Sequence, residues 1–217
     1  MQSEKSMCEY YAARAQEYDA IYQKPERQAD LRIIEDWIPQ ILSGRRVLEI
    51  ACGTGYWTQF IAPKAAQVVA IDAAQETLEI AKQRENTKKV DFRIADAYAL
   101  PDQLGSFDAA FAGFWFSHIP LQRVRPFLID LHKKLMPGAI VLFLDNLYVE
   151  GNSTPIGESD KEENTYQIRK LRDGTSHRVL KNFPSEEELK KMIEGIGGEA
   201  QYHRFNYYWT FSYKTLP

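Results

Sequence analysis

The stretch VLEIACGTGYWT, residues 47–58, constrains the fold of this chain more than any other. A short apolar run typical of a strand ends at Gly53 and Gly55, and a helical polarity pattern follows. Glycine accepts positive φ angles and lets a ligand lie against the backbone, while a helix N-terminus offers unpaired N–H groups. The stretch therefore predicts a strand, a tight turn and a helix that together bind a nucleotide-like cofactor.

The spacing of the glycines separates two classes of cofactor. Dinucleotide-binding domains place a third glycine in the pattern GxGxxG, where it packs the helix against the strand. Thr58 occupies that position here, and an acidic residue, Glu49, precedes the turn. A nicotinamide oxidoreductase is therefore disfavoured. The stretch LEIACGTGYWT resembles instead the first motif of class I S-adenosylmethionine-dependent methyltransferases.

Length and composition favour a single domain. The chain has 217 residues, of which 44% are hydrophobic, and this suits one α/β domain. Its net charge of -3 gives no overall attraction to nucleic acid or to anionic membranes, and no stretch is long and apolar enough to cross a bilayer. Cys8 and Cys52 have no metal-type spacing. We expect a cytoplasmic monomer or homodimer with no metal, nucleic acid or membrane partner.

Strand-like and helical segments alternate after the glycine turn. Strands are expected at 67–71, 90–95, 107–116 and 139–144, with helices at 74–84 and 121–135 between them. The segments YYxxRAxEYD, FDAAFAGFWFSHIP and LMPG also resemble motifs of the same family, in its order. The resemblance implies a Rossmann-like, doubly wound α/β fold whose seven strands have the order 3-2-1-4-5-7-6, with strand 7 antiparallel. It also implies a helical lid at the N-terminus and a β-hairpin inserted after strand 5.

The resulting domain, residues 1–217, divides into four parts. A helical lid or cap covers 1–45, with helices at 6–22 and 26–42, and the cofactor-binding core covers 46–145. A loop and a hairpin over the acceptor site are expected at 146–183, with a polar, exposed loop at 150–164. A helix and two antiparallel strands, interrupted at Asn206, complete the chain over 184–217.

The cofactor site is expected at the carboxyl ends of the strands. Asp72 follows the glycines by about twenty residues, where it either binds ribose hydroxyls or caps the next helix. The resemblance implies that Asp96 accepts from the adenine amino group, that the Ala97 N–H serves a ring nitrogen, and that Arg14 binds the methionine carboxylate. The expected set is Tyr11, Arg14, Tyr18, Glu49, Ala51, Gly53, Gly55, Trp57, Asp72, Ala73, Asp96 and Ala97.

The acceptor site is expected beside the strand at 107–116. His118 follows that strand, where it acts as a base, orients the acceptor, or instead caps a helix or bonds to backbone. Trp115 forms a pocket wall or packs in the core. Tyr22 is expected to line the same site from the lid.

A hairpin signal at Asp173 and Gly174 brings basic side chains together. A two-residue loop would place Arg169 opposite Arg178, whereas a type I turn with Gly174 as a bulge would place it opposite His177. We expect Arg169, Arg178 and Lys181 to surround an anion, since like charges facing one another across strands destabilise a hairpin. The alternative is that these side chains extend into solvent.

The most specific resemblance concerns the substrate. The segments YYxxRAxEYD, GTGYWT, WFSHIP and LRDGTSHRVLKNF are similar to those of small phosphonate O-methyltransferases. This implies O-methylation of a small anionic acceptor by in-line transfer from S-adenosylmethionine, with S-adenosylhomocysteine as product. N- or S-methylation of a small metabolite and a non-catalytic cofactor-binding subunit are the alternatives.

Overall fold

The computed structural model describes residues 15–171 and 174–217, with side chains from residue 19 onward. Its main feature is a seven-stranded sheet with the order β3-β2-β1-β4-β5-β10-β9. The strands are β1 (Arg46–Ile50), β2 (Gln67–Asp72), β3 (Asp91–Ile94), β4 (Phe107–Gly113), β5 (Leu135–Asn146), β9 (Gly197–Arg204) and β10 (Tyr208–Thr215). Strands β1 to β5 pair in parallel, and β10 is antiparallel to both β5 and β9. The predicted order and the antiparallel last strand are confirmed.

The helices are mostly shorter than the sequence pattern predicts. They are η1 (Ala15–Gln23), η2 (Pro25–Arg27), α2 (Gln28–Ile41), α3 (Thr58–Ile61), α4 (Gln75–Ala81), η3 (Asp102–Leu104), η4 (Phe116–His118), α5 (Leu121–His132) and α6 (Glu186–Met192). The described part of the expected first helix is a 3-10 helix, not an α-helix, and α3 is a single turn. Helix α6 begins with a capping box, in which Ser185 and Glu188 satisfy one another's backbone N–H groups.

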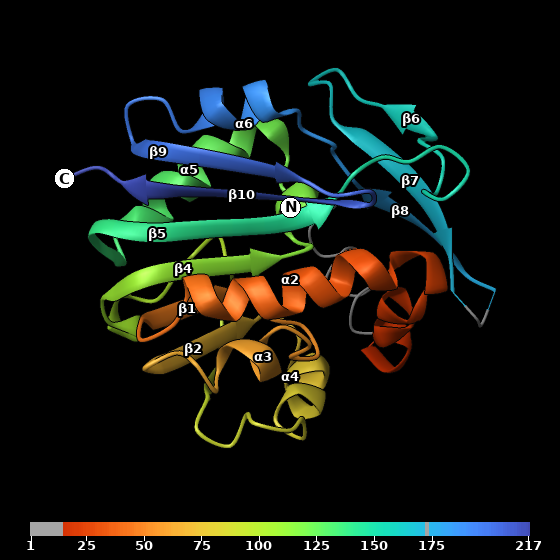
Figure 1. Cartoon of the computed structure of the whole chain (residues 1–217). Helices are drawn as coiled ribbons and strands as arrows, with labels where there is room; N and C mark the ends of the chain where they lie inside the picture. Colours follow the sequence, from red (N-terminus) through yellow and green to blue (C-terminus); the bar gives the residue numbers. More distant parts are fainter. Residues whose placement is uncertain (1–14, 172–173) are drawn as a thin grey trace.

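The helices form two layers, one on each face of the sheet (Figure 1). Successive side chains of a strand point to opposite faces, so Val47 packs toward α2 and α3 while Leu48 packs toward α5 and α6. Both faces of β1 are therefore buried, as its nearly continuous apolar sequence requires.

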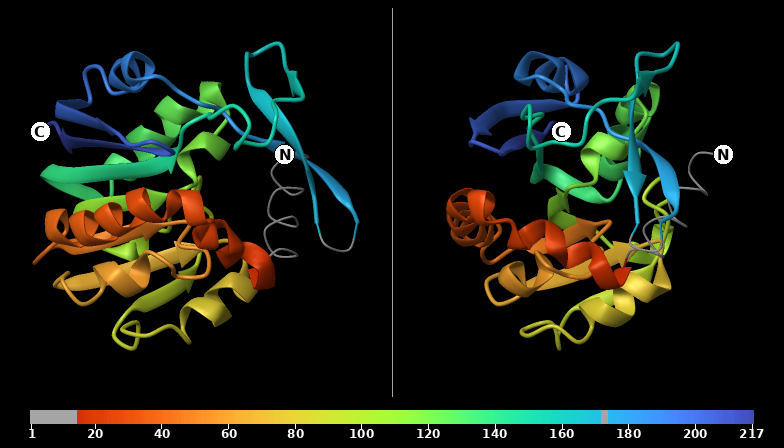
Figure 2. Two further views of the ribbon diagram at one scale, coloured as in Figure 1. Left: turned by 45° about the vertical axis from the view of Figure 1, so that its right-hand side comes forward. Right: turned by 90° about the vertical axis from the view of Figure 1, so that its right-hand side faces the viewer.

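A second, three-stranded sheet lies beyond the carboxyl ends of β1, β4 and β5, at the right of Figure 1 and again in both views of Figure 2. It consists of β6 (Glu158–Ser159), β7 (Thr165–Lys170) and β8 (Ser176–Leu180). The expected hairpin is present. The expectation of a plain loop at 150–164 is wrong in part, because β6 pairs there with β7 and adds a third strand.

The two glycines of the turn after β1 meet different surroundings. A Cβ atom on Gly55 would lie 2.8 Å from Cβ of Ala81 in α4, whereas a Cβ atom on Gly53 would meet nothing within 4 Å. Both residues have positive φ angles, of 74° and 56°. We expect Gly55→Ala to lower the free energy of unfolding by about 2 to 4 kcal/mol, because overpacking adds to backbone strain.

Gly53→Ala is the matched control, and we expect it to cost only about 1 to 2 kcal/mol from backbone strain. Urea unfolding of both variants without cofactor measures the difference. Equal losses of stability would contradict the packing role assigned to Gly55.

Candidate cofactor and acceptor site

The turn after β1 presents its backbone at the carboxyl edge of the sheet. Ala51, Gly53 and Gly55 all adopt left-handed φ angles, and the N–H of Gly55 donates to the Cys52 carbonyl over 3.0 Å. The open space beside Gly53 is where a ligand can approach the main chain, whereas Gly55 is required for contact with α4. Of the two glycines, Gly53 therefore fits the cofactor contact and Gly55 serves the fold.

Asp72 joins this turn to the next strand and helix. Its Oδ2 accepts from the Gly53 N–H over 2.8 Å, and its Oδ1 accepts from the Ala74 N–H over 2.9 Å and from the Thr77 hydroxyl over 3.0 Å. Burial raises the pKa of Asp72, and the hydrogen bonds from Ala74 and Gly53 oppose that shift. The structure thus shows Asp72 bound to backbone N–H groups before α4, which is close to the helix-capping role that the sequence left as an alternative. Its contact with ribose stays a prediction.

Glu49 lies buried beneath the same turn. Burial raises the pKa of its carboxyl to about 8, with the Thr58 hydroxyl opposing and the charge of Asp72 adding to the shift. Its Oε2 has no hydrogen-bond partner among the described residues, and the Thr58 hydroxyl also lacks a bond of normal geometry. A buried carboxyl with an unpartnered oxygen fits a cofactor that carries positive charge.

The expected adenine end lies after β3. Asp96 is exposed and its Oδ1 accepts from the Tyr98 N–H over 2.8 Å, while Ala97 is buried and Ala73, after β2, is exposed. Trp115 is half-buried, with its ring 5.5 Å from the Tyr98 ring. Tyr98 and Trp115 thus connect the segments after β3 and β4, although β2 and β1 lie between these strands in the sheet.

Two expected site residues lie in the core instead. The Trp57 ring is buried and packs so closely on β4 that a Cβ atom on Gly113 would lie 2.8 Å from it. The Tyr22 ring is also buried, and it stacks on the Tyr56 ring with centroids 3.4 Å apart. Both rings therefore act in core packing. Tyr11 and Arg14 lie outside the described residues, and so does the side chain of Tyr18.

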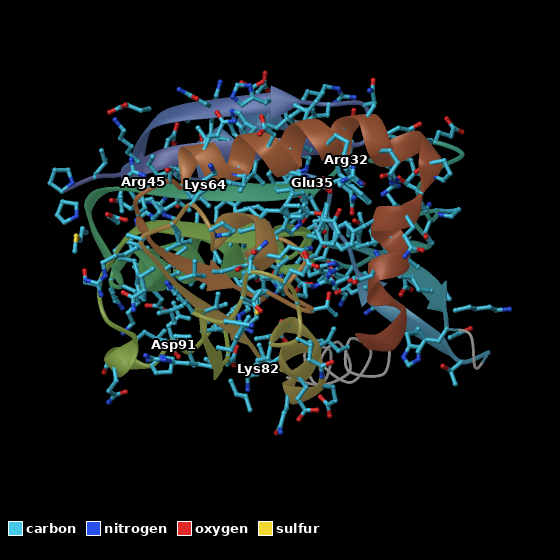
Figure 3. All side chains as sticks on the ribbon, turned by 60° about the horizontal axis from the view of Figure 1, so that its bottom comes forward. Arg32, Glu35, Arg45, Lys64, Lys82 and Asp91 are labelled. Carbon is cyan, nitrogen blue, oxygen red and sulfur yellow. The ribbon has the colours of Figure 1, made fainter. Side chains whose placement is uncertain are left out.

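Glu35 of α2 helps to place this aromatic group. Its carboxylate accepts from the Tyr56 hydroxyl and, over 2.6 Å, from Arg32. Arg32 and Glu35 lie beside one another on α2 in Figure 3. The contact holds Tyr56, and with it the glycine turn, against α2.

On the acceptor side, a buried ion pair connects the small sheet to the large one. The Lys181 ammonium, 3% exposed, donates to Asp145 Oδ1 over 2.6 Å and to Ser117 Oγ over 2.5 Å. The Asp145 Oδ2 accepts from the Ser117 N–H over 2.9 Å. Sequence reasoning missed Asp145 and Ser117, although Asp145 directly follows the predicted strand at 139–144, where ligand-binding residues are common.

His118 is tied to the backbone of β8. Its Nδ1 donates to the Leu180 carbonyl, and its ring is buried. A neutral histidine that donates from Nδ1 carries its lone pair on Nε2. The structure thus shows the backbone bond that sequence reasoning left as one alternative, and a role as base or orienting group stays a prediction.

The register of the hairpin separates the arginines. Arg169 faces His177 and Ile168 faces Arg178, so the register with Gly174 as a bulge is correct. Alternate residues of a strand point to opposite faces, and Arg178 therefore points away from Arg169 and Lys181. The expectation that Arg169, Arg178 and Lys181 surround one anion is wrong for Arg178. Its guanidinium instead pairs with Glu158 and covers the ring of Tyr166.

Arg27, which sequence reasoning missed, supplies positive charge on the side of Lys181. Burial lowers the pKa of Lys181, Asp145 opposes that shift, and the charges of Arg169 and Arg27 add to it. Arg27 is 9% exposed, lies over the rings of Tyr207 and Tyr208, and donates to Asn152 Oδ1. A buried arginine in a 3-10 turn gives no sequence signal, because only the fold packs it against Tyr207 and Tyr208.

Within residues 15–171 and 174–217, no group of three or more His, Cys, Asp or Glu side chains could hold a metal ion. No helix in the same ranges is long and apolar enough to cross a membrane.

Comparisons with known proteins agree with this geometry. Residues 47–138 match the methyltransferase domain family. The structure is similar to that of the DhpI–SAH complex, at 30% identity and a TM-score of 0.77, covering 99% of this chain and 98% of that one. It is also similar to the DhpI–SAM–HEP complex, at 29% identity and a TM-score of 0.80, covering 97% of each chain.

A curated relative extends the comparison. The chain is 29% identical over 180 residues to demethylmenaquinone methyltransferase of Staphylococcus aureus (strain JH9), covering 72% of this chain and 69% of the relative. The chain belongs to the class I S-adenosylmethionine-dependent methyltransferases. Its cofactor is S-adenosylmethionine, as predicted.

The raised pKa of Glu49 predicts how stability depends on pH. Between pH 4.5, its ordinary value, and about 8, the folded protein holds a proton that the unfolded chain has released. The stability of the cofactor-free protein should therefore fall as pH rises through this window, by up to a few kcal/mol from this group. Glu49→Gln removes this dependence. The free energy of unfolding of the variant, measured with urea, should therefore rise relative to that of the unmodified protein between pH 5 and pH 8.

The exposed residue Glu187 provides the control, because Glu187→Gln removes a carboxylate that remains in water. Unfolding curves of Glu49→Gln that run parallel to those of the unmodified protein at every pH would contradict a buried, protonated Glu49.

Proposed function

We propose that this methyltransferase transfers the methyl group to an oxygen atom of a small anionic acceptor, held by Lys181, Arg169 and Arg27. The observation that carries the proposal is that Arg169 and Lys181 lie on the same face of the hairpin, and that Lys181 and Arg27 are both buried cations. Lys181 pairs directly with a single carboxylate, Asp145.

The carboxylates that lie close to Arg27 in sequence bind other groups. Glu26 accepts from Asn152 over 2.7 Å, and Asp30 accepts from Asn206 and from the Tyr207 N–H. Arg27 forms no ion pair with a carboxylate of the described residues, and its guanidinium donates to the side-chain oxygen of Asn152. Buried positive charge is costly unless an anion pairs with it, so an anionic acceptor would stabilise Arg27.

For methyl transfer, the protein mainly has to position the acceptor oxygen relative to the methyl group. S-adenosylmethionine supplies a methyl group on a positively charged sulfur. Transfer forms a C–O bond and breaks the C–S bond, whose electron pair stays on the sulfur. An oxygen that is already anionic has no proton to lose, so Lys181, Arg169 and Arg27 need only hold it in line and shield it from water.

His118 then serves as a positioning residue. Its bond to the Leu180 carbonyl fixes the end of β8, the residue before Lys181. If the acceptor oxygen carried a proton, the same ring would be the candidate base. The ternary DhpI–SAM–HEP complex, 29% identical over 97% of each chain, is a relative in which cofactor and a second ligand bind together, and this supports a small second ligand here.

The proposal predicts which acceptors react. We expect S-adenosylhomocysteine to form with small phosphonates, phosphates or carboxylates, and not with neutral alcohols, amines or thiols of matched size. Arg27→Gln and Arg169→Gln should each raise the acceptor KM at least tenfold, because each removes a charge-assisted contact worth about 1.5 to 3 kcal/mol. Inorganic phosphate should compete with the acceptor.

Arg178→Gln is the matched control, since it removes the same charge from the opposite face of the same hairpin. Its acceptor KM should change less than twofold. Reaction with amines or thiols would support N- or S-methylation instead, and cofactor binding with no product from any acceptor would support a non-catalytic subunit. Unchanged KM values in both Arg27 and Arg169 variants would contradict the anionic site.

A further inference from the structure

A second polar cluster lies on the other side of the glycine turn, around Arg84. This residue follows α4, and its side chain reaches back to Thr54, between the two glycines. Its Nε donates to the Thr54 carbonyl, and its NH2 group donates to the Thr54 hydroxyl over 3.1 Å and to the carboxylate of Asp19. The Thr54 hydroxyl donates in turn to Asp19 Oδ1 over 2.8 Å. Arg84, Thr54 and Asp19 thus form a closed hydrogen-bonded triad.

The triad connects three segments that are distant in sequence. Asp19 belongs to η1, Thr54 to the turn after β1, and Arg84 to the turn after α4. The Arg84 backbone is itself fixed, because the Thr87 hydroxyl donates to its carbonyl over 2.9 Å. Arg84 therefore acts from a fixed base on both the glycine turn and η1.

A second contact also attaches η1 to the segment after the glycine turn. The Tyr22 ring stacks on the Tyr56 ring, two residues after Thr54, and the Arg84 guanidinium lies 5.6 Å from the centroid of the Tyr56 ring. Asp19 and Tyr22 are one turn apart, so the same side of η1 meets the turn twice. Loss of Arg84 would weaken the first contact directly and leave the second in place.

We infer that Arg84 is a positioning residue for cofactor binding, which acts through Thr54 and Asp19. By holding the Thr54 carbonyl and hydroxyl, it fixes the peptide planes between Gly53 and Gly55, which present the backbone to the cofactor. By holding Asp19, it closes η1 onto the same turn. Cofactor affinity then depends on Arg84 although the described contacts of its side chain are all with protein.

The hydrogen bonds from Arg84 to Thr54 stabilise the triad more than the ion pair between Arg84 and Asp19 does. The side chains of Arg84 and Asp19 are 16% and 39% exposed, and ion pairs open to solvent contribute little. Thr54 is buried, so removing Arg84 would leave its carbonyl without this donor. A substitution at Arg84 should therefore affect cofactor binding more than one at Asp19.

The test is the dissociation constant of S-adenosylhomocysteine, measured by titration calorimetry on the full chain. We expect Arg84→Gln to raise it five- to twentyfold, Asp19→Asn to raise it about two- to fivefold, and Arg84→Lys to lie between the unmodified protein and Arg84→Gln. The double variant should be no weaker than Arg84→Gln alone, because both residues act through one triad. Dissociation rates should rise in parallel.

Lys134→Gln is the control. Lys134 pairs with Asp102 over 2.8 Å and is 11% exposed, but it directly precedes β5, at the amino end of that strand. Its substitution should change the dissociation constant less than twofold, and the melting temperatures of cofactor-free Lys134→Gln and Arg84→Gln should be similar. The inference would be overturned if Arg84→Gln and Lys134→Gln had the same dissociation constant. It would also be overturned if the effects of Arg84→Gln and Asp19→Asn added in the double variant. If Arg84→Gln does not fold, the isosteric Asp19→Asn must still weaken binding, and normal affinity there would overturn it as well.

Discussion

The carboxylate of Asp72 is the constraint on which the cofactor side of the molecule depends. It accepts hydrogen bonds from Gly53 in the turn after β1 and from Ala74 in the segment after β2. It therefore holds these two neighbouring loops together. Burial would otherwise make such a carboxylate costly, and its backbone donors offset that cost. The turn that presents Gly53 to a ligand is therefore held by bonds within the protein itself.

The same principle recurs on the acceptor side with opposite charge. Lys181 is buried and paired with Asp145, so the end of β8 is attached to the end of β5. Arg169 and Arg27 add positive charge near this pair, from two elements that meet only in the folded chain. The glycine turn thus rests on the carboxylate of Asp72, whereas the small sheet is joined to the large one through the Lys181–Asp145 pair.

Sequence reasoning succeeded where a residue's role follows from its local pattern. The apolar runs and the GxG turn predicted the strands, the aromatic run interrupted at Asn206 predicted the final antiparallel pair, and the family resemblance implied the sheet order. The contacts that individual side chains make were harder to predict from the sequence. Trp57 follows the glycine turn in sequence yet packs on Gly113, because the helical twist after the turn carries its ring to the α2 face. Arg178 was misplaced relative to Lys181 because the hairpin register decides which face each residue occupies.

By itself, the sequence determined the fold class, the methyltransferase family and the position of the cofactor turn. The strands and the turn depend on short-range patterns, namely strand periodicity and glycines that accept positive φ angles, and the family followed from motifs that resemble those of its members. Only the tertiary structure decided that Asp145 pairs with Lys181, that Arg27 packs on Tyr207 and Tyr208, and that Arg84 meets Thr54 and Asp19. The physical reason is that charged side chains find their partners across elements distant in sequence, and neither spacing nor composition encodes those distances.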